Sequence, residues 1–317
     1  MNSIIPEPLI ETWPHKTVLY HEVTTILRPH QGGQYVDATL GAGGHSFSIL
    51  SESTPDGLLL GIDRDSQALE IAHRRLARFG KRLILKNANF SQLENLIEEI
   101  GWQFIDGIIF DLGVSSMQLE TPGRGFSFLK DEPLDMRFDQ DNGITAAEII
   151  NNEKEEELAR VIWENGEEPQ ARQIAAAICR ARPLKSTGEL ARLVSTIYHG
   201  PRGRIHPATR TFQALRMAVN QELQSLQSSL EQALHLLVRG GRMAIISFHS
   251  LEDRLVKQFI RRESKDCICP PEQPICTCGH KASLKILTRH AIAPSEDEIQ
   301  KNSRARSAHL RAAEKII

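Results

Sequence analysis

A glycine-rich turn between an apolar run and a helix-like segment limits the possible folds of this chain more than any other feature. The turn contains Gly41, Gly43 and Gly44, and Asp63 ends a second apolar run about twenty residues later. Glycine lets the backbone turn tightly and approach a ligand closely, and an acid at the end of the next strand can accept hydrogen bonds from both hydroxyls of a ribose. The sequence therefore predicts a nucleotide site in an α/β fold.

The spacing of the glycines distinguishes between classes of nucleotide. A dinucleotide site requires Gly-x-Gly-x-x-Gly, but the sixth position counted from Gly41 is Ser46, so the pyrophosphate-binding pattern is interrupted. Counted from Asp37, the residues read acid-x-Thr-x-Gly-x-Gly-Gly. This string resembles the first motif of S-adenosylmethionine-dependent methyltransferases, with Thr39 at the position of the motif's first glycine.

Strand and helix signals alternate through the first half of the chain. A helix begins at Ser46, Asp65 can cap the next one, and Ser91 with Glu94 predicts a capping box for a third. This βαβ series predicts a doubly wound, mostly parallel sheet, similar to the Rossmann-like sheet of class I methyltransferases. The strands that we expect are 35–38, 58–63, 83–85 and 105–110.

The alternation stops after Asp111, where a stretch rich in glycine and proline follows. Capping boxes and helical periodicity then predict a small all-helical insert over residues 138–206. We therefore divide the chain into a first methyltransferase part at 1–137, the insert at 138–206 and a second methyltransferase part at 207–317. In the second part we expect a long helix from about 208 to 238 and strands at 242–248 and 309–314. The predicted boxes are Thr145 with Glu148 and Ser186 with Glu189.

Composition bounds the class of protein. The chain has 317 residues, of which 40% are hydrophobic and 25% are charged, which is typical of a globular protein. No apolar stretch is long enough for a membrane span and the N-terminus has no signal pattern, so we expect a cytoplasmic protein without a membrane partner. The formal net charge of −2 implies that any nucleic-acid contact uses a local patch.

Four of the five cysteines lie in one segment, at Cys267, Cys269, Cys276 and Cys278. Two Cys-x-Cys pairs, with prolines and a glycine forcing turns, could converge on a tetrahedral zinc ion. Because Cys-x-Cys is tighter than the usual Cys-x-x-Cys knuckle, we favour a reduced loop stiffened by proline over a metal site. The fifth cysteine, Cys179, lies in an alanine- and isoleucine-rich helix and is expected in a core.

Several polar residues fall at or just beyond the ends of predicted strands. In an open α/β sheet the ligand binds at the carboxyl ends of the strands, so one ligand could touch Asp63, Asp111 and His249 together with the glycine turn. Phe90 is placed to cover a flat heterocycle. Each residue also has a structural interpretation: Asp111 could cap a turn, His249 could be a core imidazole, and Phe90 could only pack.

Seven strings of the sequence, in order, resemble the MraW-type family, also called RsmH, of bacterial 16S ribosomal RNA cytosine-N4 methyltransferases. The resemblance runs from His15 to the Arg304–Ser307 segment and is far more specific than a glycine turn. The strings are 15–19, 43–46, 111–116, 124–128, 134–137, 206–214 and 247–254.

The resemblance implies an S-adenosylmethionine site and an RNA substrate. It assigns the ribose to Asp63 and a place beside the adenine to Phe90. It also implies that the substrate is a cytidine in the decoding region of the small ribosomal subunit, methylated on its exocyclic nitrogen, and that the helical insert helps to recognise it. The remaining implied cofactor residues are Gly43, Gly44, His45, Asp111 and Gln118.

The catalytic residue stays unassigned. Methyl transfer from a sulfonium is an in-line displacement, so the enzyme must mainly position the donor and the nitrogen, and Asp111 or a backbone carbonyl could hold the amino protons. Many amino-methyltransferases carry Asn/Asp/Ser-Pro-Pro-aromatic after the fourth strand, whereas this chain has Asp111-Leu112-Gly113-Val114. The base-stacking role of that motif therefore cannot be transferred.

RNA contacts are predicted from basic residues near aromatic ones or in loops. Arg124 with Phe126 and Phe128 could stack on an unpaired base, and a loop bearing Arg204 and Arg210 suits phosphates. The alternatives are a buried aromatic pair and a solvated loop. We also count His249 among the residues that could face the substrate.

Two other functions remain open at this point. A nicotinamide-dependent oxidoreductase could use the same sheet, although Ser46 argues against it. A non-catalytic ribosome-binding module organised by the cysteine segment would bind metal and transfer no methyl group. The sequence leaves the oligomeric state open, with a homodimer as one possibility.

Overall fold

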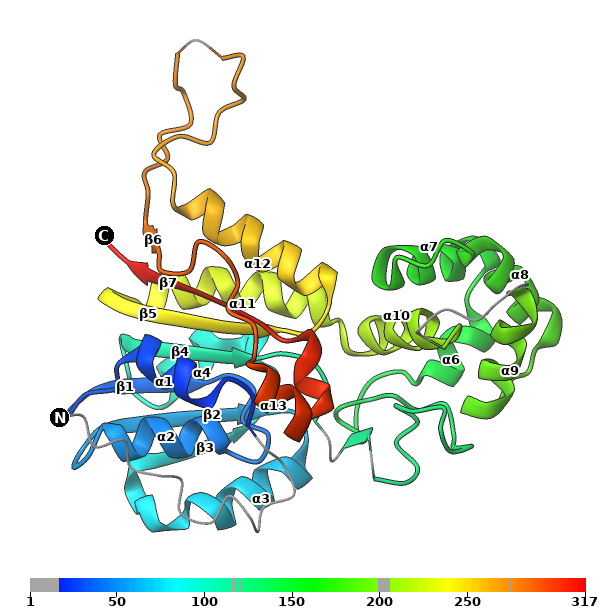
Figure 1. Cartoon of the computed structure of the whole chain (residues 1–317), viewed down its shortest axis with the longest axis horizontal. Helices are drawn as coiled ribbons and strands as arrows, with labels where there is room; N and C mark the ends of the chain where they lie inside the picture. Colours follow the sequence, from blue (N-terminus) through cyan, green and yellow to red (C-terminus); the bar gives the residue numbers. More distant parts are fainter. Residues whose placement is uncertain (1–16, 116–117, 120, 199–205, 274) are drawn as a thin grey trace. The chain divides into compact units, whose positions relative to one another are not determined.

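The computed structural model describes residues 17–115, 118–119, 121–198, 206–273 and 275–317. The chain forms two compact units, drawn in Figure 1. The first comprises the chain up to residue 113 together with 225–317, and the second comprises residues 114–224. The second unit includes the whole range 138–206 that the sequence predicts as a helical insert.

The first unit is built on a seven-stranded sheet with the strand order β3-β2-β1-β4-β5-β7-β6. Strands β1 to β5 are parallel, and β7 is antiparallel to both β5 and β6. The order reverses direction at β1, so the sheet is doubly wound and mostly parallel, as predicted. The bounds are β1 Gln34–Asp37, β2 Leu58–Asp63, β3 Leu83–Asn87, β4 Ile105–Asp111, β5 Leu237–Ser247, β6 Leu284–Ile286 and β7 His309–Lys315.

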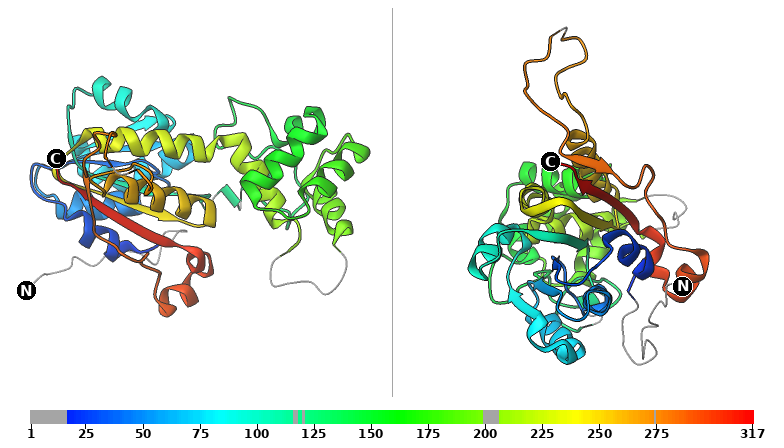
Figure 2. Two further views of the ribbon diagram at one scale, coloured as in Figure 1. Left: turned by 90° about the horizontal axis from the view of Figure 1, so that it is seen from above. Right: turned by 90° about the vertical axis from the view of Figure 1, so that its left-hand side faces the viewer.

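Helices cover both faces of this sheet (Figure 2). Successive strand residues point to opposite faces, so Val36 and Ile108 belong to one buried core while Tyr35 and Ile109 belong to another. The first core includes residues of α4, α11 and α12, and the second includes residues of α1 and α2. The helices of this unit are α1 Tyr20–Leu27, α2 Gly44–Glu52, α3 Ser66–Leu76, α4 Leu93–Glu99, α11 Glu222–Leu236, which starts in the second unit, α12 Ser250–Glu263 and α13 Glu296–Lys301.

One of two predicted helix starts in this unit is confirmed and the other is wrong. The side chain of Asp65 caps α3 by accepting a hydrogen bond from the amide of Gln67, as predicted. The predicted capping box of Ser91 with Glu94 is wrong, because the side chain of Asn89 accepts the amide of Ser91 and begins a short 3-10 helix instead. Helix α4 then starts at Leu93 without a side-chain cap.

The long helix predicted from about 208 to 238 is in fact two helices. Helix α10 covers Thr209–Asn220, and α11 follows after Gln221, whose φ of 52° places it in the left-handed region. The predicted start of the next strand is also wrong: β5 begins at Leu237, so Gly240 lies inside it with a φ of 85°. The pairing of β5 with β4 shifts register near this point, between Ile105 and Gly107.

The second unit is helical and has a core of its own. Both predicted capping boxes of this unit are present, at Thr145 with Glu148 and at Ser186 with Glu189. The helices lying wholly in this unit are α6 Ala146–Asn152, α7 Glu155–Gly166, α8 Ala171–Ala181, α9 Thr187–Ile197 and α10.

Among the described residues, no helix of either unit is long and apolar enough to cross a membrane.

Candidate functional site

Three aspartates lie at the carboxyl ends of adjacent parallel strands: Asp37 on β1, Asp63 on β2 and Asp111 on β4. Thr39, at the position of the motif's first glycine, accepts a hydrogen bond on its Oγ1 from the amide of Asp111 at 2.6 Å. The loop after β1 is therefore tied directly to the end of β4. This explains how a threonine can serve at a position where related motifs carry glycine.

Asp37 is a site residue whose importance the sequence analysis missed. Its carboxylate is 1% exposed and accepts hydrogen bonds from Ser46 Oγ at 2.7 Å and from the amide of Thr39 at 3.3 Å. Burial raises the pKa of Asp37 to about 6, although the hydrogen bond from Ser46 lowers it. Ser46, which interrupts the dinucleotide pattern, thus anchors the first turn of α2 to the end of β1. The sequence signal that could have identified Asp37 is its position as the first residue of the acid-x-Thr-x-Gly motif.

The carboxylate of Asp63 holds the glycine turn. Oδ2 accepts a hydrogen bond from the amide of Gly41 at 2.8 Å, and Oδ1 accepts one from the amide of Asp65 at 2.9 Å. Burial raises the pKa of Asp63 to about 6, although these two amides lower it. Each oxygen retains a second lone pair for a further donor. The ribose contact of Asp63 remains a prediction.

Two glycines of the turn are required by their surroundings. Gly43 has a φ of 77°, and a β-carbon there would lie 2.9 Å from Leu76. A β-carbon at Gly44 would collide with the side chain of Thr17. Gly44 therefore lets the start of α2 pack against the segment before α1, which is a structural reason for this glycine in addition to the predicted cofactor contact.

Asp111 and His45 face each other at the strand ends. His45 is 4% exposed, and its Nε2 lies 3.8 Å from Asp111 Oδ2. The other carboxylate oxygen, Oδ1, is buried and has no hydrogen-bond partner among the residues that the structure describes. Burial, and then the charges of Asp37 and Glu252, raise the pKa of Asp111 to about 8. A buried acceptor without a partner is costly unless a ligand supplies a donor.

Phe90 and His249 have structural contacts within the first unit. The ring of Phe90 packs edge-on against Phe110 with centroids 5.8 Å apart. His249 caps α12, because its Nδ1 accepts the amide of Glu252 at 3.4 Å. Gln118, the other predicted cofactor residue, belongs to the second unit, where it is buried and its Oε1 accepts the amide of Ser115. The cofactor and substrate roles of these residues remain predictions.

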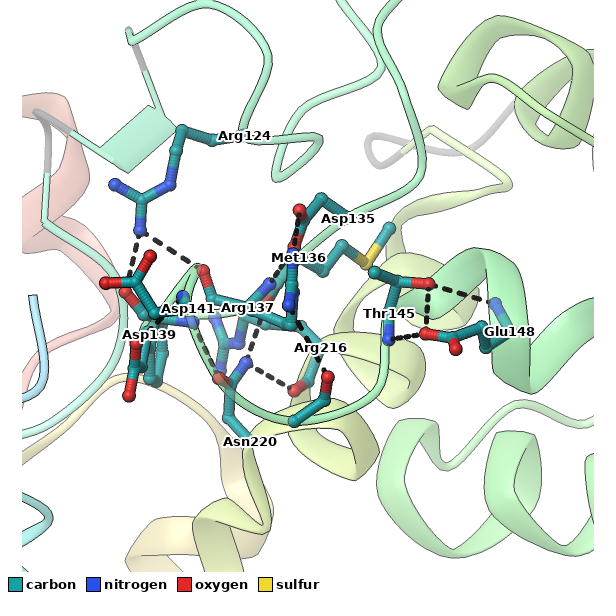
Figure 3. Close-up of polar contacts among 12 residues, drawn as sticks. Arg124, Asp135, Met136, Arg137, Asp139, Asp141, Thr145, Glu148, Arg216 and Asn220 are labelled. Atoms are coloured by element: carbon teal, nitrogen blue, oxygen red, sulfur yellow. Dashed lines mark hydrogen bonds and ion pairs between the residues drawn. The ribbon is translucent and has the colours of Figure 1, made fainter.

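Arg124 lies inside the second unit and not on its surface. It is 2% exposed, and its Nη2 donates to the carbonyls of Arg137 at 3.1 Å and Phe138 at 3.0 Å (Figure 3). Asn220 holds the same loop, since its Nδ2 donates to the carbonyl of Met136. Met136 is buried with a φ of 64°, so this loop needs such fixed contacts. The structure gives Arg124 a role in building this loop.

The aromatic residues near Arg124 also have partners within the unit. Phe126 stacks on Phe138 with centroids 5.6 Å apart, and Phe128 stacks on His206 at 4.5 Å. The Nη1 of Arg210 donates to the carbonyl of Glu167 at the end of α7. Arg204 lies outside the described residues. The predicted RNA contacts of Arg124, Arg204 and Arg210 remain predictions.

The four clustered cysteines follow α12 and converge. Their sulfur atoms, on Cys267, Cys269, Cys276 and Cys278, all lie within 4.8 Å of one another, and all four are free thiols. Cys179 is half-buried and packs against the core of the second unit. The four clustered cysteines could together hold a metal ion.

Comparison with known proteins gives a consistent result. The sequence model of the MraW methylase family matches residues 12–316. A ribosomal RNA small subunit methyltransferase H from Dehalococcoides mccartyi is 51% identical over 96% of this chain and 87% of its own. Another from Syntrophotalea carbinolica is 52% identical over 96% of this chain and 99% of its own. A solved rRNA methylase from Streptococcus thermophilus is 13% identical, with a TM-score of 0.43 and a coverage of 94% of both chains.

Proposed function

The chain belongs to the MraW methylase family, and from this premise we propose that it methylates the exocyclic N4 nitrogen of a cytidine in the decoding region of 16S ribosomal RNA. The observation that carries the proposal is the match to that family over nearly the whole chain, together with relatives about half identical that are named for the small ribosomal subunit. We infer a cytoplasmic location, where such subunits are found.

The strand-end acids suit S-adenosylmethionine as the methyl donor. This cofactor supplies an electrophilic methyl group on a positively charged sulfur. Asp63, beside the glycine turn, would accept the hydroxyls of its ribose, and the buried oxygen of Asp111 that lacks a partner among the described residues would receive one of its donors or the substrate's amino group. The remaining proposed contacts are with Gly43, Gly44, His45, Phe90 and, from the second unit, Gln118.

The residues of the chain have one chemical task besides positioning. As the new carbon–nitrogen bond forms, the carbon–sulfur bond breaks and the amino group must lose one proton. Asp111 is a suitable acceptor once it has lost its own proton, because burial and the neighbouring acids raise its pKa to about 8, so that its carboxylate is a stronger base than an ordinary one. His45 Nε2, 3.8 Å from that carboxylate, lies where it can orient the acid.

The positions of the cysteines favour a nitrogen target over a ring carbon. Activation of a pyrimidine ring carbon needs a covalent nucleophile, typically a thiolate. Strands β1 to β5 and the loops that follow β1, β2 and β3 contain no cysteine. An exocyclic nitrogen needs no such adduct.

The test is to incubate the protein with radiolabelled S-adenosylmethionine and small subunits that lack the modification, then digest the RNA and identify the labelled nucleoside. We expect N4-methylcytidine. Naked RNA run in parallel shows whether the assembled subunit is required. Label in 5-methylcytidine, or in a nucleoside other than cytidine, would overturn the proposal.

A second part of the proposal concerns the helical residues 138–206. We propose that this range recognises the RNA, while 1–137 and 207–317 form the methyltransferase part. A positively charged side chain of this range such as Arg172, exposed on α8, could approach a phosphate. Arg172→Ala should then weaken subunit binding without changing the affinity for S-adenosylhomocysteine, and equal loss of both would argue against the division.

A further inference from the structure

The segment between α12 and β6, residues 264–283, projects from the first unit as a long loop (Figure 1). None of its described residues is buried, and none belongs to a hydrophobic core. Ile268 and Ile275 are 45% and 74% exposed. Ordering a loop of this length costs conformational entropy that packing does not offset here, so another interaction must hold it.

The base of the loop is closed by hydrogen bonds. The amide of Ser283 donates to the carbonyl of Glu263 at 2.8 Å, and His280 Nε2 lies 3.1 Å from the carbonyl of Arg262. These contacts bring the two ends together but leave the outer part of the loop unexplained. In that outer part lie the four cysteines.

The sulfur separations match those of a zinc tetrahedron. Cys267 Sγ lies 3.4 Å from Cys276 Sγ and 3.8 Å from Cys278 Sγ, and the last two are 3.5 Å apart. Four thiolates at about 2.3 Å from a zinc ion are separated by about 3.8 Å along each tetrahedral edge. The observed separations are far longer than the roughly 2.05 Å of a disulfide. Cys269 completes the set, within 4.8 Å of the others.

Backbone amides in the loop point at the sulfurs. The amide of Ile268 donates to Cys278 Sγ at 3.5 Å, and that of Cys269 donates to Cys267 Sγ at 3.4 Å. Such donors offset part of the negative charge that four thiolates place on one site, and they help to fix the direction of these two ligands. The tight Cys-x-Cys spacing, which argued against a metal from sequence, is thus compatible with convergence because each pair turns back on the other.

We propose that Cys267, Cys269, Cys276 and Cys278 bind one zinc ion that holds the projecting loop in its folded form. The site is a closed set of four protein ligands, so it is structural and leaves no position for water or substrate. The inference does not depend on the proposed methyl transfer, because it follows from the loop alone.

The test is metal analysis of the whole protein purified without chelators. We expect about one zinc per chain in the wild type and in the control Cys179→Ser, and almost none in the double variant Cys276→Ser/Cys278→Ser. Replacement with cobalt should give the strong visible absorption of tetrahedral thiolate-bound cobalt only in the first two proteins. Hydrogen exchange in the loop should rise when zinc is removed.

Several outcomes would overturn the proposal. These are wild-type protein without bound metal, iron in place of zinc, or a mass that shows the cysteines joined in disulfides. Because the loop adds nothing to the core, the double variant should keep its helical circular-dichroism signal and its affinity for S-adenosylhomocysteine. If it instead fails to fold, the metal content and cobalt spectrum of the wild type and of Cys179→Ser still decide the question.

Discussion

At the scale of single residues, the three aspartates at the strand ends differ in their hydrogen bonds despite their similar positions. Asp37 accepts hydrogen bonds from Ser46 and Thr39, Asp63 accepts them from two backbone amides, and Asp111 keeps one oxygen without a partner among the described residues. Asp37 and Asp63 therefore both organise the loops at the strand ends, whereas Asp111 is the acid that still offers that oxygen to a ligand.

Replacement of Asp63 tests the proposed ribose contact. Asp63→Asn keeps the size of the side chain but replaces one acceptor oxygen with a donor. A hydrogen bond to a charged group contributes about 1.5–3 kcal/mol, so the affinity for S-adenosylhomocysteine should fall roughly 10- to 100-fold. Isothermal titration calorimetry measures this change.

The matched control for Asp63→Asn is Asp106→Asn. Asp106 is also a strand aspartate that accepts a backbone amide, that of Gln34 at 2.7 Å, but it lies at the opposite end of the sheet. Its replacement should leave the affinity unchanged. Equal affinities in the two variants would mean that the ribose binds elsewhere.

The raised pKa of Asp111 predicts how stability depends on pH. An unfolded aspartate titrates near 3.8 and the folded one near 8, so the unfolded chain loses its proton first and the folded protein loses stability as the pH rises across this interval. Asp111→Asn has no proton to lose. Its Tm minus that of the wild type, measured by calorimetry without cofactor, should therefore increase between these pH values and stay constant above them.

Asp135→Asn is the control, and its change in Tm should have the opposite sign. Burial alone would raise the pKa of Asp135, but hydrogen bonds from Arg137 at 2.8 and 2.9 Å outweigh it and lower the pKa. This variant should lower the Tm, with the loss fully present above the ordinary aspartate pKa. A Tm difference for Asp111→Asn that is flat with pH would show that this carboxyl is not perturbed.

Sequence reasoning found part of the candidate site because strand ends can be located from apolar runs. Asp63 and Asp111 end such runs, and the structure brings both to the same edge of the sheet. The hydrogen bond from the Asp111 amide to Thr39 was not predicted, since a hydrogen bond between residues far apart in sequence leaves no local signal. Arg124 was considered as a residue that could stack on an RNA base, because an arginine that bonds to backbone carbonyls is indistinguishable in sequence from one that faces a ligand.

At the scale of elements, the break between α10 and α11 has a testable energetic consequence. Gln221 is exposed and adopts a left-handed conformation, which costs a residue with a β-carbon about 1 kcal/mol. Gln221→Gly should therefore raise the free energy of unfolding by up to ~1 kcal/mol, as measured by urea denaturation.

The same substitution inside a helix should act in the opposite direction. Gln227 is exposed in the interior of α11, and Gln227→Gly should lower the free energy of unfolding by ~1 kcal/mol because glycine is a poor helix former. If both substitutions destabilise the protein equally, residues 209–236 form one continuous helix in solution, as the sequence had predicted.

The elements of the first half were predictable because each strand is a short apolar run bounded by glycine or a polar cap. The second half was harder for physical reasons. Gln221 carries no conformational signal of a break, and Gly240, which resembles a helix terminator, accommodates a register shift within β5. The antiparallel direction of β7 depends on a pairing with β5 across more than sixty residues of sequence.

At the scale of the whole molecule, the candidate cofactor residues come from both compact units. Most lie in the first unit, whereas Gln118 lies in the second and is proposed only from the family resemblance. A cofactor that contacts both units would couple methyl-donor binding to the helical unit, so the question is whether the ligand protects one unit or both.

Hydrogen exchange with and without S-adenosylhomocysteine answers this question. A ligand that binds only the native state slows exchange where it stabilises local structure. We expect slower exchange at 37–45, 61–65 and 111–113 of the first unit and in the peptide that carries Gln118. The peptide of α9, Thr187–Ile197, serves as the internal control and should not change. Protection confined to the first unit would remove Gln118 from the site, and protection throughout α9 would mean that the ligand stabilises the helical unit as a whole.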